Sequence, residues 1–388
     1  MSEDLYPELP TLASAEHRAW RDTVRRFVAE EVTPFHAQWE QDGQVPRALW
    51  HRAGELGLLC LTVPAELGGA GVDFGFAAIV THELARAGAT GPLFYLHSDI
   101  VAPYLLHHGS AAQQQHWLPR MARGELIGAI GMTEPGAGSD LAAIRTRAER
   151  SAAGFVVNGQ KTFISNGQLC DLLLLAAKTD GAAGAHGISL LLADAHAPGF
   201  RRGRRLDKLG MHAQDTSELF FDDLHLPADA LLGEAGRGFV MMMKELPQER
   251  LLVAITAVGA MEAAIEWTRE HVLQRQAFGA PLAKLPTIRH ELARLHSQVC
   301  VARAFLDQCL ARHLRGELDA AGASMAKAWC TEAQFQVLDG CVQLFGGSGY
   351  MREMPIARAW ADARVQRVYG GTTEVMNEIV ARALLGRL

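Results

Sequence analysis

Residues 288–309 read IRHELARLHSQVCVARAFLDQC, and this stretch decides how the C-terminal part of the chain folds. Its apolar side chains recur at alternating intervals of four and three residues, at Ile288, Leu292, Leu295, Val299, Ala302, Leu306 and Cys309. On an α-helix this spacing places all of them on one face. An apolar face of that length predicts a long helix packed at a shallow angle against similar helices, as in a helical bundle.

Helical periodicity extends in both directions from a central region of different character. It holds from about residue 236 to the C-terminus, and it also runs from residue 14 to about residue 124, with segments that end at Gly57 and Gly88. Between these regions the chain changes to short apolar or β-branched runs bounded by turn residues, which predicts strands. The four clearest runs are residues 154–165, 172–178, 188–193 and 219–226.

One dipeptide in the central region carries a strong turn signal. Asn158-Gly159 lies between two short runs of apolar and β-branched residues, which is typical of a two-residue β-hairpin, so we predict a hairpin there. The fold class is therefore mainly α with a central β domain. We expect an N-terminal helical domain over residues 1–125, a middle β domain over 126–235 and a C-terminal helical bundle over 236–388.

Composition and charge exclude several classes of protein. The chain of 388 residues is 49% hydrophobic and 21% charged, with a formal net charge of −6, which opposes a general affinity for nucleic acid or anionic membrane. Six cysteines without a C-x-x-C pattern predict buried thiols in a reducing compartment. The N-terminus MSEDLYPELP is acidic, and no apolar run approaches the roughly 20 residues of a membrane span. We expect a cytoplasmic protein without integral membrane association.

Three familiar motifs almost occur and fail. The pairs His82-Glu83 and His290-Glu291 are each followed by arginine where H-E-x-x-H needs its second histidine, so we expect no metal site of this kind. Gln160 breaks the spacing of a phosphate-binding P-loop. The segment Gly136-Ala137-Gly138 lacks the third glycine of the dinucleotide fingerprint and does not sit between a strand and a helix. Any bound dinucleotide therefore does not lie on a Rossmann fold.

Four segments combine glycine with small hydroxyl residues. Such segments let backbone N–H groups approach the oxygens of a ligand closely, as phosphates and flavin rings require. They are residues 131–140 (GMTEPGAGSD), 161–167 (KTFISNG), 343–350 (QLFGGSGY) and 368–374 (VYGGTTE). Each segment alone is also compatible with an ordinary loop.

In this order, across a helix–strand–helix chain, the four segments resemble the acyl-CoA dehydrogenase family over nearly the whole sequence. Residues 243–251 (MKELPQERL) and 274–279 (QRQAFG) are most similar to its long-chain type. The resemblance implies a barrel-like middle domain, a C-terminal four-helix bundle and FAD as the cofactor. It also implies an acyl-CoA substrate, an electron-transfer flavoprotein as the electron acceptor, and a homotetramer, or at least a dimer.

The resemblance also assigns individual residues. Phe163 takes the position of an aromatic side chain stacked on the flavin, and Ser165 that of a hydroxyl bonded to its ring. Arg275 and Phe278 would reach the FAD of a neighbouring subunit. The complete cofactor set is Met132, Thr133, Ser139, Phe163, Ser165, Arg275, Phe278, Gln343, Gly347 and Thr372. The substrate set is Ser139, near the CoA moiety, and Arg250.

The catalytic base follows from a departure within the family pattern. Many members carry it in a Tyr-Glu-Gly-Thr motif, but this chain reads Tyr369-Gly370-Gly371-Thr372, so Gly370 cannot be the base. The long-chain and isovaleryl types place the carboxylate just before an arginine, which is Glu249 here. The resemblance thus assigns Glu249 as the base that removes the α-proton. It assigns the Gly370 backbone N–H as a hydrogen-bond donor to the thioester oxygen.

Several functions remain open on the same fold. The leading expectation is α,β-dehydrogenation of a medium-chain, long-chain or branched acyl-CoA. Alternatives are the same chemistry on an acyl carrier protein thioester in a biosynthetic pathway, and an acyl-CoA oxidase that passes electrons to O₂. A different class is a flavoprotein that binds DNA or acts as a scaffold. The absence of a basic run after residue 236 and the intact Glu249 favour an enzyme.

Overall fold

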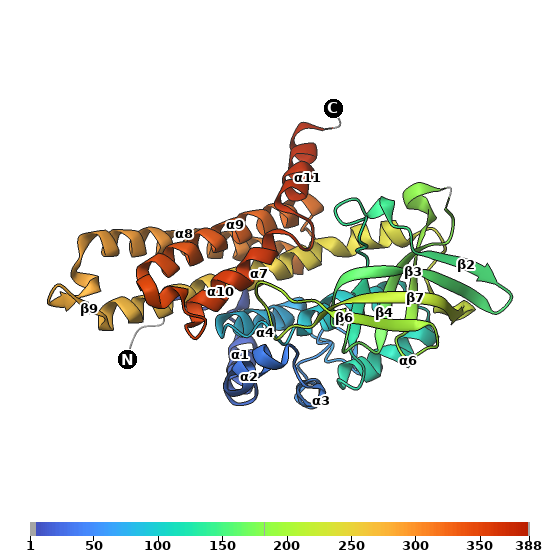
Figure 1. Cartoon of the computed structure of the whole chain (residues 1–388), viewed down its shortest axis with the longest axis horizontal. Helices are drawn as coiled ribbons and strands as arrows, with labels where there is room; N and C mark the ends of the chain where they lie inside the picture. The colour runs from blue at the N-terminus through green and yellow to red at the C-terminus, as the bar shows by residue number, and fades with distance from the viewer. Residues whose placement is uncertain (1–4, 182, 387–388) are drawn as a thin grey trace.

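The N-terminal region is a layer of helices that packs beneath the long C-terminal helices (Figure 1). The structure is a computed structural model that describes residues 5–181 and 183–386. The α-helices of this region are α1 (Ala15–Phe27), α2 (Thr33–Asp42), α3 (Arg47–Glu55), α4 (Phe74–Arg86), α5 (Ala102–His108) and α6 (Ala111–Ala122). Two π-helical segments continue or precede them, η2 (Val28–Val32) and η4 (Leu96–Val101).

Local sequence explains where these helices begin and end. The Ser14 hydroxyl caps α1 by accepting from the His17 N–H, and Ser110 and Gln113 form a capping box at the start of α6. The predicted terminators act as expected, because Gly57 and Gly88 follow α3 and α4 with positive φ angles of 69° and 65°. The helical expectation for this region is confirmed.

The middle region is one mixed β-sheet. All four predicted strand runs are strands, and the described residues contain eight strands in this sheet, in the order β6-β7-β3-β2-β4-β5-β8 with β1 paired in parallel to β4. Their bounds are β1 (Gly128–Gly131), β2 (Arg147–Ser151), β3 (Gly154–Ser165), β4 (Leu172–Lys178), β5 (Ile188–Asp194), β6 (Phe200–Arg205), β7 (Thr216–Pro227) and β8 (Leu231–Leu232). A separate apolar core lies within the sheet, around Phe155, Leu175 and Phe221.

The predicted hairpin at Asn158-Gly159 is wrong. Both residues lie inside the continuous strand β3, where the pairing with β7 shifts register between Val157 and Gly159. This irregularity is a β-bulge, and the Asn158 amide stabilises it by donating to the Asp223 carboxylate on β7 at 2.9 Å. The true hairpin turn lies earlier, between β2 and β3, where Ser151 pairs with Gly154. A glycine with positive φ occurs in bulges as well as in turns, so the Asn-Gly dipeptide alone does not distinguish a bulge from a hairpin turn.

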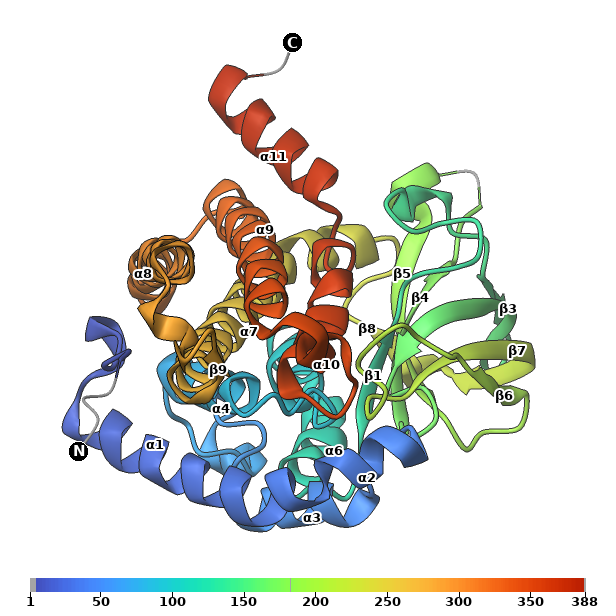
Figure 2. The same cartoon turned by 60° about the vertical axis from the view of Figure 1, so that its left-hand side comes forward.

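The C-terminal region is a bundle of long helices with one helix projecting from it (Figures 1 and 2). The helices are α7 (Gly238–Gln274), α8 (Pro286–Leu314), α9 (Ala320–Phe345), α10 (Pro355–Ala363) and α11 (Thr373–Leu385). A short hairpin of β9 (Gln276–Ala277) and β10 (Ala280–Pro281) joins α7 to the following helix. The predicted apolar face of α8 is buried from Leu295 to Cys309, while Ile288 and Leu292 are half-buried. Helix α11 contacts α9 and extends away from the bundle.

Two sequence expectations need correction. Five cysteines are buried, but Cys300 is exposed, because it lies on the outward face of α8, one residue beyond the buried Val299. Helix α7 is also long and apolar enough, by length and composition, to cross a membrane. Within the protein 78% of that apolar stretch is buried, which is the environment of a core helix. Charged residues such as Glu245, Glu249 and Glu262 interrupt the apolar residues of α7, so the sequence holds no unbroken apolar run of that length.

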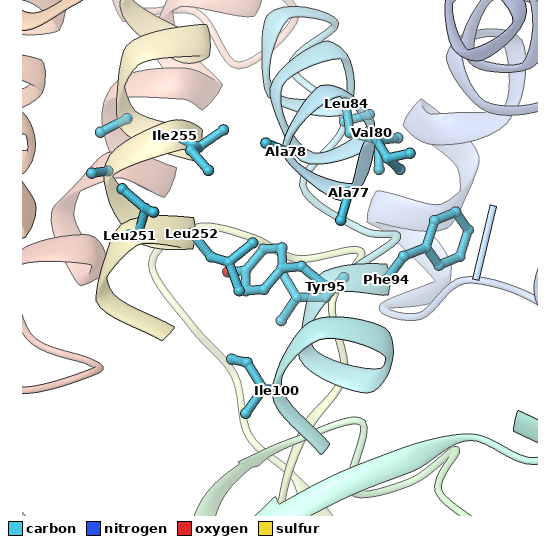
Figure 3. Close-up of a cluster of buried hydrophobic side chains, with 14 of the residues drawn as sticks. Ala77, Ala78, Val80, Leu84, Phe94, Tyr95, Ile100, Leu251, Leu252 and Ile255 are labelled. Carbon is cyan, nitrogen blue, oxygen red and sulfur yellow. The ribbon is translucent and has the colours of Figure 1, made fainter. Parts of the chain in front are cut away.

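A shared apolar cluster fixes α7 against the N-terminal helices. Figure 3 shows Leu252 and Ile255 of α7 pointing toward Tyr95 and toward Ala78 of α4, with Leu251 of α7 in the same cluster. These side chains are buried, and complete burial of a leucine or isoleucine contributes about 1.5–3 kcal/mol. Because Leu251 follows Glu249 by only two residues, the same packing fixes the position of that carboxylate.

Candidate active site

Glu249 lies in the first part of α7 and is almost completely buried, with 8% of its surface exposed. Burial raises the pKa of this carboxyl from its ordinary value of 4.5 to about 7, because desolvation disfavours the charged form. The Tyr104 hydroxyl on α5 donates a hydrogen bond to Glu249 Oε1 at 3.1 Å and partly opposes that rise. A carboxyl group with a pKa near neutrality suits general acid–base chemistry at physiological pH.

A second carboxylate lies one helical turn before Glu249. Glu245 Oε1 accepts from two histidines on α5, His107 through Nδ1 at 3.0 Å and His108 through Nε2 at 3.1 Å. The hydrogen bond to Glu245 raises the pKa of His107 above its ordinary value. Glu245 therefore has its own hydrogen-bond partners, whereas Glu249 is bonded to Tyr104.

Arg250, which follows Glu249, and Lys327 of α9 are two buried cations that lie close enough to influence each other. The Arg250 guanidinium donates to Ser324 Oγ at 3.3 Å, and desolvation lowers its pKa. The Lys327 ammonium donates to the carbonyl oxygen of Gly371, and burial, followed by the neighbouring Arg250 charge, lowers the pKa of Lys327 to about 8. Helix α9 thereby ties the 370–371 backbone to the region around Glu249.

Gly370 takes the position at which, by the resemblance described above, many family members carry the glutamate of the Tyr-Glu-Gly-Thr motif. Its φ angle is +64°, and a Cβ placed on it would lie 3.9 Å from Val253 Cγ2. Val253 follows Glu249 by one turn on the same helix. The structure therefore brings both positions assigned from the family pattern, 249 and 370, to one region of α7.

The segment η4 connects this region to the sheet. The Gln248 side chain donates to the Asp99 carbonyl oxygen at 2.7 Å, and the Gly128 N–H at the start of β1 donates to His97 Nδ1 at 2.9 Å. His97 and Asp99 both belong to η4. Strand β1 leads directly into Met132 and Thr133, the first assigned cofactor residues.

Met132, Thr133, Phe163 and Ser165 come together where β1 ends beside β3. The Thr162 N–H donates to the Thr133 carbonyl oxygen at 3.0 Å. The Phe163 ring is 67% exposed although it belongs to a strand, and its φ angle is +59°, an uncommon value for a bulky residue. An exposed aromatic ring held in a strained backbone is suited to stacking on a flat ligand.

A buried ion pair holds the loop that follows β1, and sequence inspection missed it. Lys161 Nζ donates to Glu134 Oε1 at 2.8 Å and to the Met132 carbonyl oxygen at 3.0 Å. The Glu134 carboxylate also accepts from the backbone N–H groups of Arg145 and Thr146, at 2.6 and 3.0 Å. Both residues lie within the glycine-containing segments 131–140 and 161–167, but only the fold shows that they pair. Ser139, farther along the same loop, is exposed.

Four other assigned residues lie at the opposite end of the bundle. Arg275 follows Glu249 on α7 by about seven turns, roughly 39 Å along the helix axis. Phe278, in the turn after β9, is 94% exposed. Gln343 and Gly347 lie at the C-terminal end of α9 near this turn, because Phe345 stacks on His271 of α7 at 4.2 Å between ring centroids.

Thr372 stays near the base. Its hydroxyl caps α11 by accepting from the Val375 N–H at 3.3 Å, and it directly follows Gly371, whose carbonyl oxygen accepts from Lys327. Within one chain the assigned residues therefore form two sets. One lies around Glu249 and the adjacent sheet, and the other lies at the far end of the bundle. The first set is Met132, Thr133, Ser139, Phe163, Ser165, Glu249, Arg250, Gly370 and Thr372. The second set is Arg275, Phe278, Gln343 and Gly347.

Both sets fit a dinucleotide cofactor. A Cβ placed on Gly136, Gly138, Gly346 or Gly347 would meet nothing within 4 Å among the described residues, so the backbone there is open to a ligand's phosphates. The exposed Phe163 ring supplies a flat apolar surface for the ring system. A helical–β–helical fold that holds a buried carboxylic acid and such open surfaces agrees with the flavin-dependent dehydrogenase that the sequence resemblance implies.

The chain belongs to the acyl-CoA dehydrogenase family. The family's N-terminal, middle and C-terminal domain models match residues 14–125, 129–224 and 236–385. The long-chain specific acyl-CoA dehydrogenase of Sus scrofa is 52% identical over 374 residues, which cover 96% of this chain and 87% of the relative. Isovaleryl-CoA dehydrogenase of Oryza sativa subsp. japonica is 34% identical and covers 94% and 90%.

Solved structures agree. An acyl-CoA dehydrogenase from Geobacillus kaustophilus superposes with a TM-score of 0.95 at 44% identity, covering 96% of this chain and 98% of the other. A glutaryl-CoA dehydrogenase from Mycobacterium smegmatis, solved in complex with FADH2, has a TM-score of 0.91 at 28% identity and covers 97% and 96%. The protein is an FAD-dependent acyl-CoA dehydrogenase, and the predicted family, fold class and cofactor are confirmed.

Proposed function

We propose that the protein oxidises the Cα–Cβ bond of medium-chain, long-chain or branched acyl-CoA thioesters to the trans-2-enoyl-CoA. The observation that carries this proposal is the burial of Glu249 beside the 370–371 backbone, with its carboxyl pKa raised to about 7. Such a carboxylate is basic enough to remove a weakly acidic α-proton, a contribution typically worth about 10² to 10⁴ in rate.

Each chain residue has a defined part in this mechanism. Glu249 takes the α-proton of the thioester. The Gly370 backbone N–H donates to the thioester oxygen, where negative charge develops, and one such donor is worth about 3 kcal/mol. Met132, Thr133 and Ser165 would hold FAD by hydrogen bonds, and Phe163 would stack on its ring system. The bound cofactor would supply the acceptor for the hydride that leaves Cβ.

We also propose that the active form is at least a dimer, and a tetramer by resemblance to the family. Arg275 lies about 39 Å from Glu249 along the axis of α7, and Phe278 follows beyond the end of that helix, so both are too far to reach a flavin bound beside Glu249 of the same chain. A neighbouring subunit would supply them. Light scattering of the purified protein tests this proposal, and a monomer that retains FAD and activity would refute it.

The electron acceptor we propose is an electron-transfer flavoprotein, in the cytoplasm. The test of the function is anaerobic titration of the FAD-loaded protein with a panel of acyl thioesters, in which bleaching of the flavin reports reduction. Bleaching by acyl-CoA, followed by reoxidation by an electron-transfer flavoprotein, supports the proposal. Bleaching only by acyl carrier protein thioesters, rapid peroxide formation in air, or no bleaching with any thioester would favour the carrier-protein, oxidase or scaffold alternative respectively.

A further inference from the structure

Tyr104 is completely buried and directs its hydroxyl at the carboxylate of Glu249. Burial raises the pKa of the Tyr104 phenol well above its ordinary value, so the hydroxyl keeps its proton and acts as the donor. The two residues are 145 positions apart in sequence and lie on α5 and α7. A donor at 3.1 Å is within hydrogen-bond range and has one acceptor, Glu249 Oε1.

Other charged groups around Glu249 form hydrogen bonds with other partners, and among them the Arg250 charge also lowers the pKa of Glu249. On α7, Glu245 accepts from His107 and His108, and Arg250 donates to Ser324 of α9. Lys327 of α9 donates to the Gly371 carbonyl oxygen. On η4, the Asp99 carboxyl is buried and its pKa is raised to about 8, so it is largely uncharged at neutral pH. Among the described residues, Tyr104 is thus the hydrogen-bond donor to the Glu249 carboxylate.

We propose that Tyr104 is the positioning residue of the catalytic base: its hydroxyl holds Oε1 of Glu249 and leaves Oε2 to take the α-proton. This inference rests on the proposed function, because it assigns a role relative to Glu249 as base. A hydrogen bond to the ionised form stabilises that form. Tyr104 therefore keeps a useful fraction of Glu249 ionised near neutral pH despite its burial, and it fixes the orientation of the carboxylate toward the substrate.

The variant Tyr104→Phe tests this role, because it removes the hydroxyl and keeps the ring. The measurement is the pH profile of kcat/KM with an acyl-CoA substrate. Loss of a hydrogen bond to a charged group raises the profile's acidic pKa by about 1 to 2 units. At pH 7 we expect kcat/KM to fall about 5- to 50-fold, because the ionised fraction of Glu249 falls from about one half, with much of the loss recovered at alkaline pH.

The matched control is Tyr6→Phe. Tyr6 is also buried, and its hydroxyl lies 2.9 Å from His296 Nδ1, but it packs against α8, away from Glu249. This variant loses a comparable hydrogen bond and should keep the wild-type pH profile. A ring-fluorinated tyrosine at position 104, whose hydroxyl is a stronger donor, should move the acidic pKa downward. It provides the decisive readout if Tyr104→Phe folds poorly.

The outcomes separate this inference from the proposed function. An unchanged acidic pKa in both position-104 variants, with normal FAD content, would overturn the role of Tyr104 while Glu249 remains the base. A loss of activity that is equal at every pH would assign Tyr104 a purely structural role and also overturn it. The variant Glu249→Gln is measured in parallel, and wild-type turnover there would overturn the base itself.

Discussion

Gly370 faces Val253, one turn beyond Glu249 on α7: a Cβ on Gly370 would lie 3.9 Å from Val253 Cγ2, with no closer contact among the described residues outside its two chain neighbours. Space for a side chain therefore exists at position 370, and it opens toward the helix that carries Glu249. The backbone of Gly370, at φ +64°, is unfavourable for other residues by about 1 kcal/mol or more. This geometry makes relocation of the base a direct test of a shared site.

The double change Glu249→Gly with Gly370→Glu should recover part of the activity that Glu249→Gly removes. Recovery will be incomplete, because the strained backbone and a misplacement of about 1 Å can cost 10²-fold. The control is Glu249→Gly with Gly370→Ala, which carries the same backbone strain without a carboxylate. If the Glu and Ala versions turn over equally with normal FAD content, the two positions do not serve one α-carbon.

Glu249→Gln should retain FAD and bind acyl-CoA but fail to bleach the flavin. The amide keeps the shape of the side chain and loses its basicity, so we expect turnover to drop by at least about 10²-fold. Glu266→Gln is the control, because Glu266 lies farther along the same helix and pairs with Arg86. Turnover of Glu249→Gln within about tenfold of wild type would reject Glu249 as the base.

Activity and stability should depend on pH in opposite directions through Glu249. The pKa of about 7 predicts that kcat/KM rises as pH passes through 7, because the base must be ionised. The folded protein holds this proton more tightly than the unfolded chain, whose ordinary value is 4.5. The stability that this proton contributes is complete below 4.5 and is lost as pH rises to about 7, by up to about 3 kcal/mol.

Glu249→Gln isolates that stability effect. The variant should therefore be more stable than wild type at pH 8, and the difference should largely vanish near pH 4.5. Thermal unfolding of both proteins at the two pH values measures it. An equal difference at both pH values would show that Glu249 does not titrate between them.

Arg275→Ala should weaken FAD retention and subunit association together. Arg275 ends α7 at the tip of the bundle, and we propose that it reaches the flavin of a neighbouring chain. The control is Arg269→Ala, an exposed arginine two turns earlier on the same helix. FAD content by absorbance and mass by light scattering are the measurements. Arg275→Ala protein that keeps both would argue against a shared site.

The absence of a side chain at position 370 should leave room for long or branched acyl groups, and substrate preference should reflect this. We expect kcat/KM to be higher for octanoyl-CoA to palmitoyl-CoA, or for branched acyl-CoA, than for butyryl-CoA. The 52% identical relative from Sus scrofa is named as long-chain specific, which supports this expectation. A clear preference for butyryl-CoA would contradict the subtype while leaving the family intact.

Sequence patterns predicted most of the fold because helices and strands depend largely on residues that are close together in the chain. The alternating spacing in α8 and the four apolar runs of the sheet each depend on near neighbours, and these elements formed as expected. Asn158-Gly159 failed because the same backbone freedom serves a bulge, and pairing with β7 decided between them. The outward position of Cys300 also depends on rotation about the helix, which its residue type does not encode.

The sequence by itself determined the class of enzyme, the glycine-rich segments that we assign to the cofactor and the absence of a carboxylate at position 370. Only the tertiary structure decided that Glu249 is buried, that Tyr104 is its hydrogen-bond partner, and that Arg275 and Phe278 lie far from it in one chain. The physical reason is that a pKa depends on solvent exclusion and on groups distant in sequence. Those quantities exist only once α5, α7 and α9 have packed together.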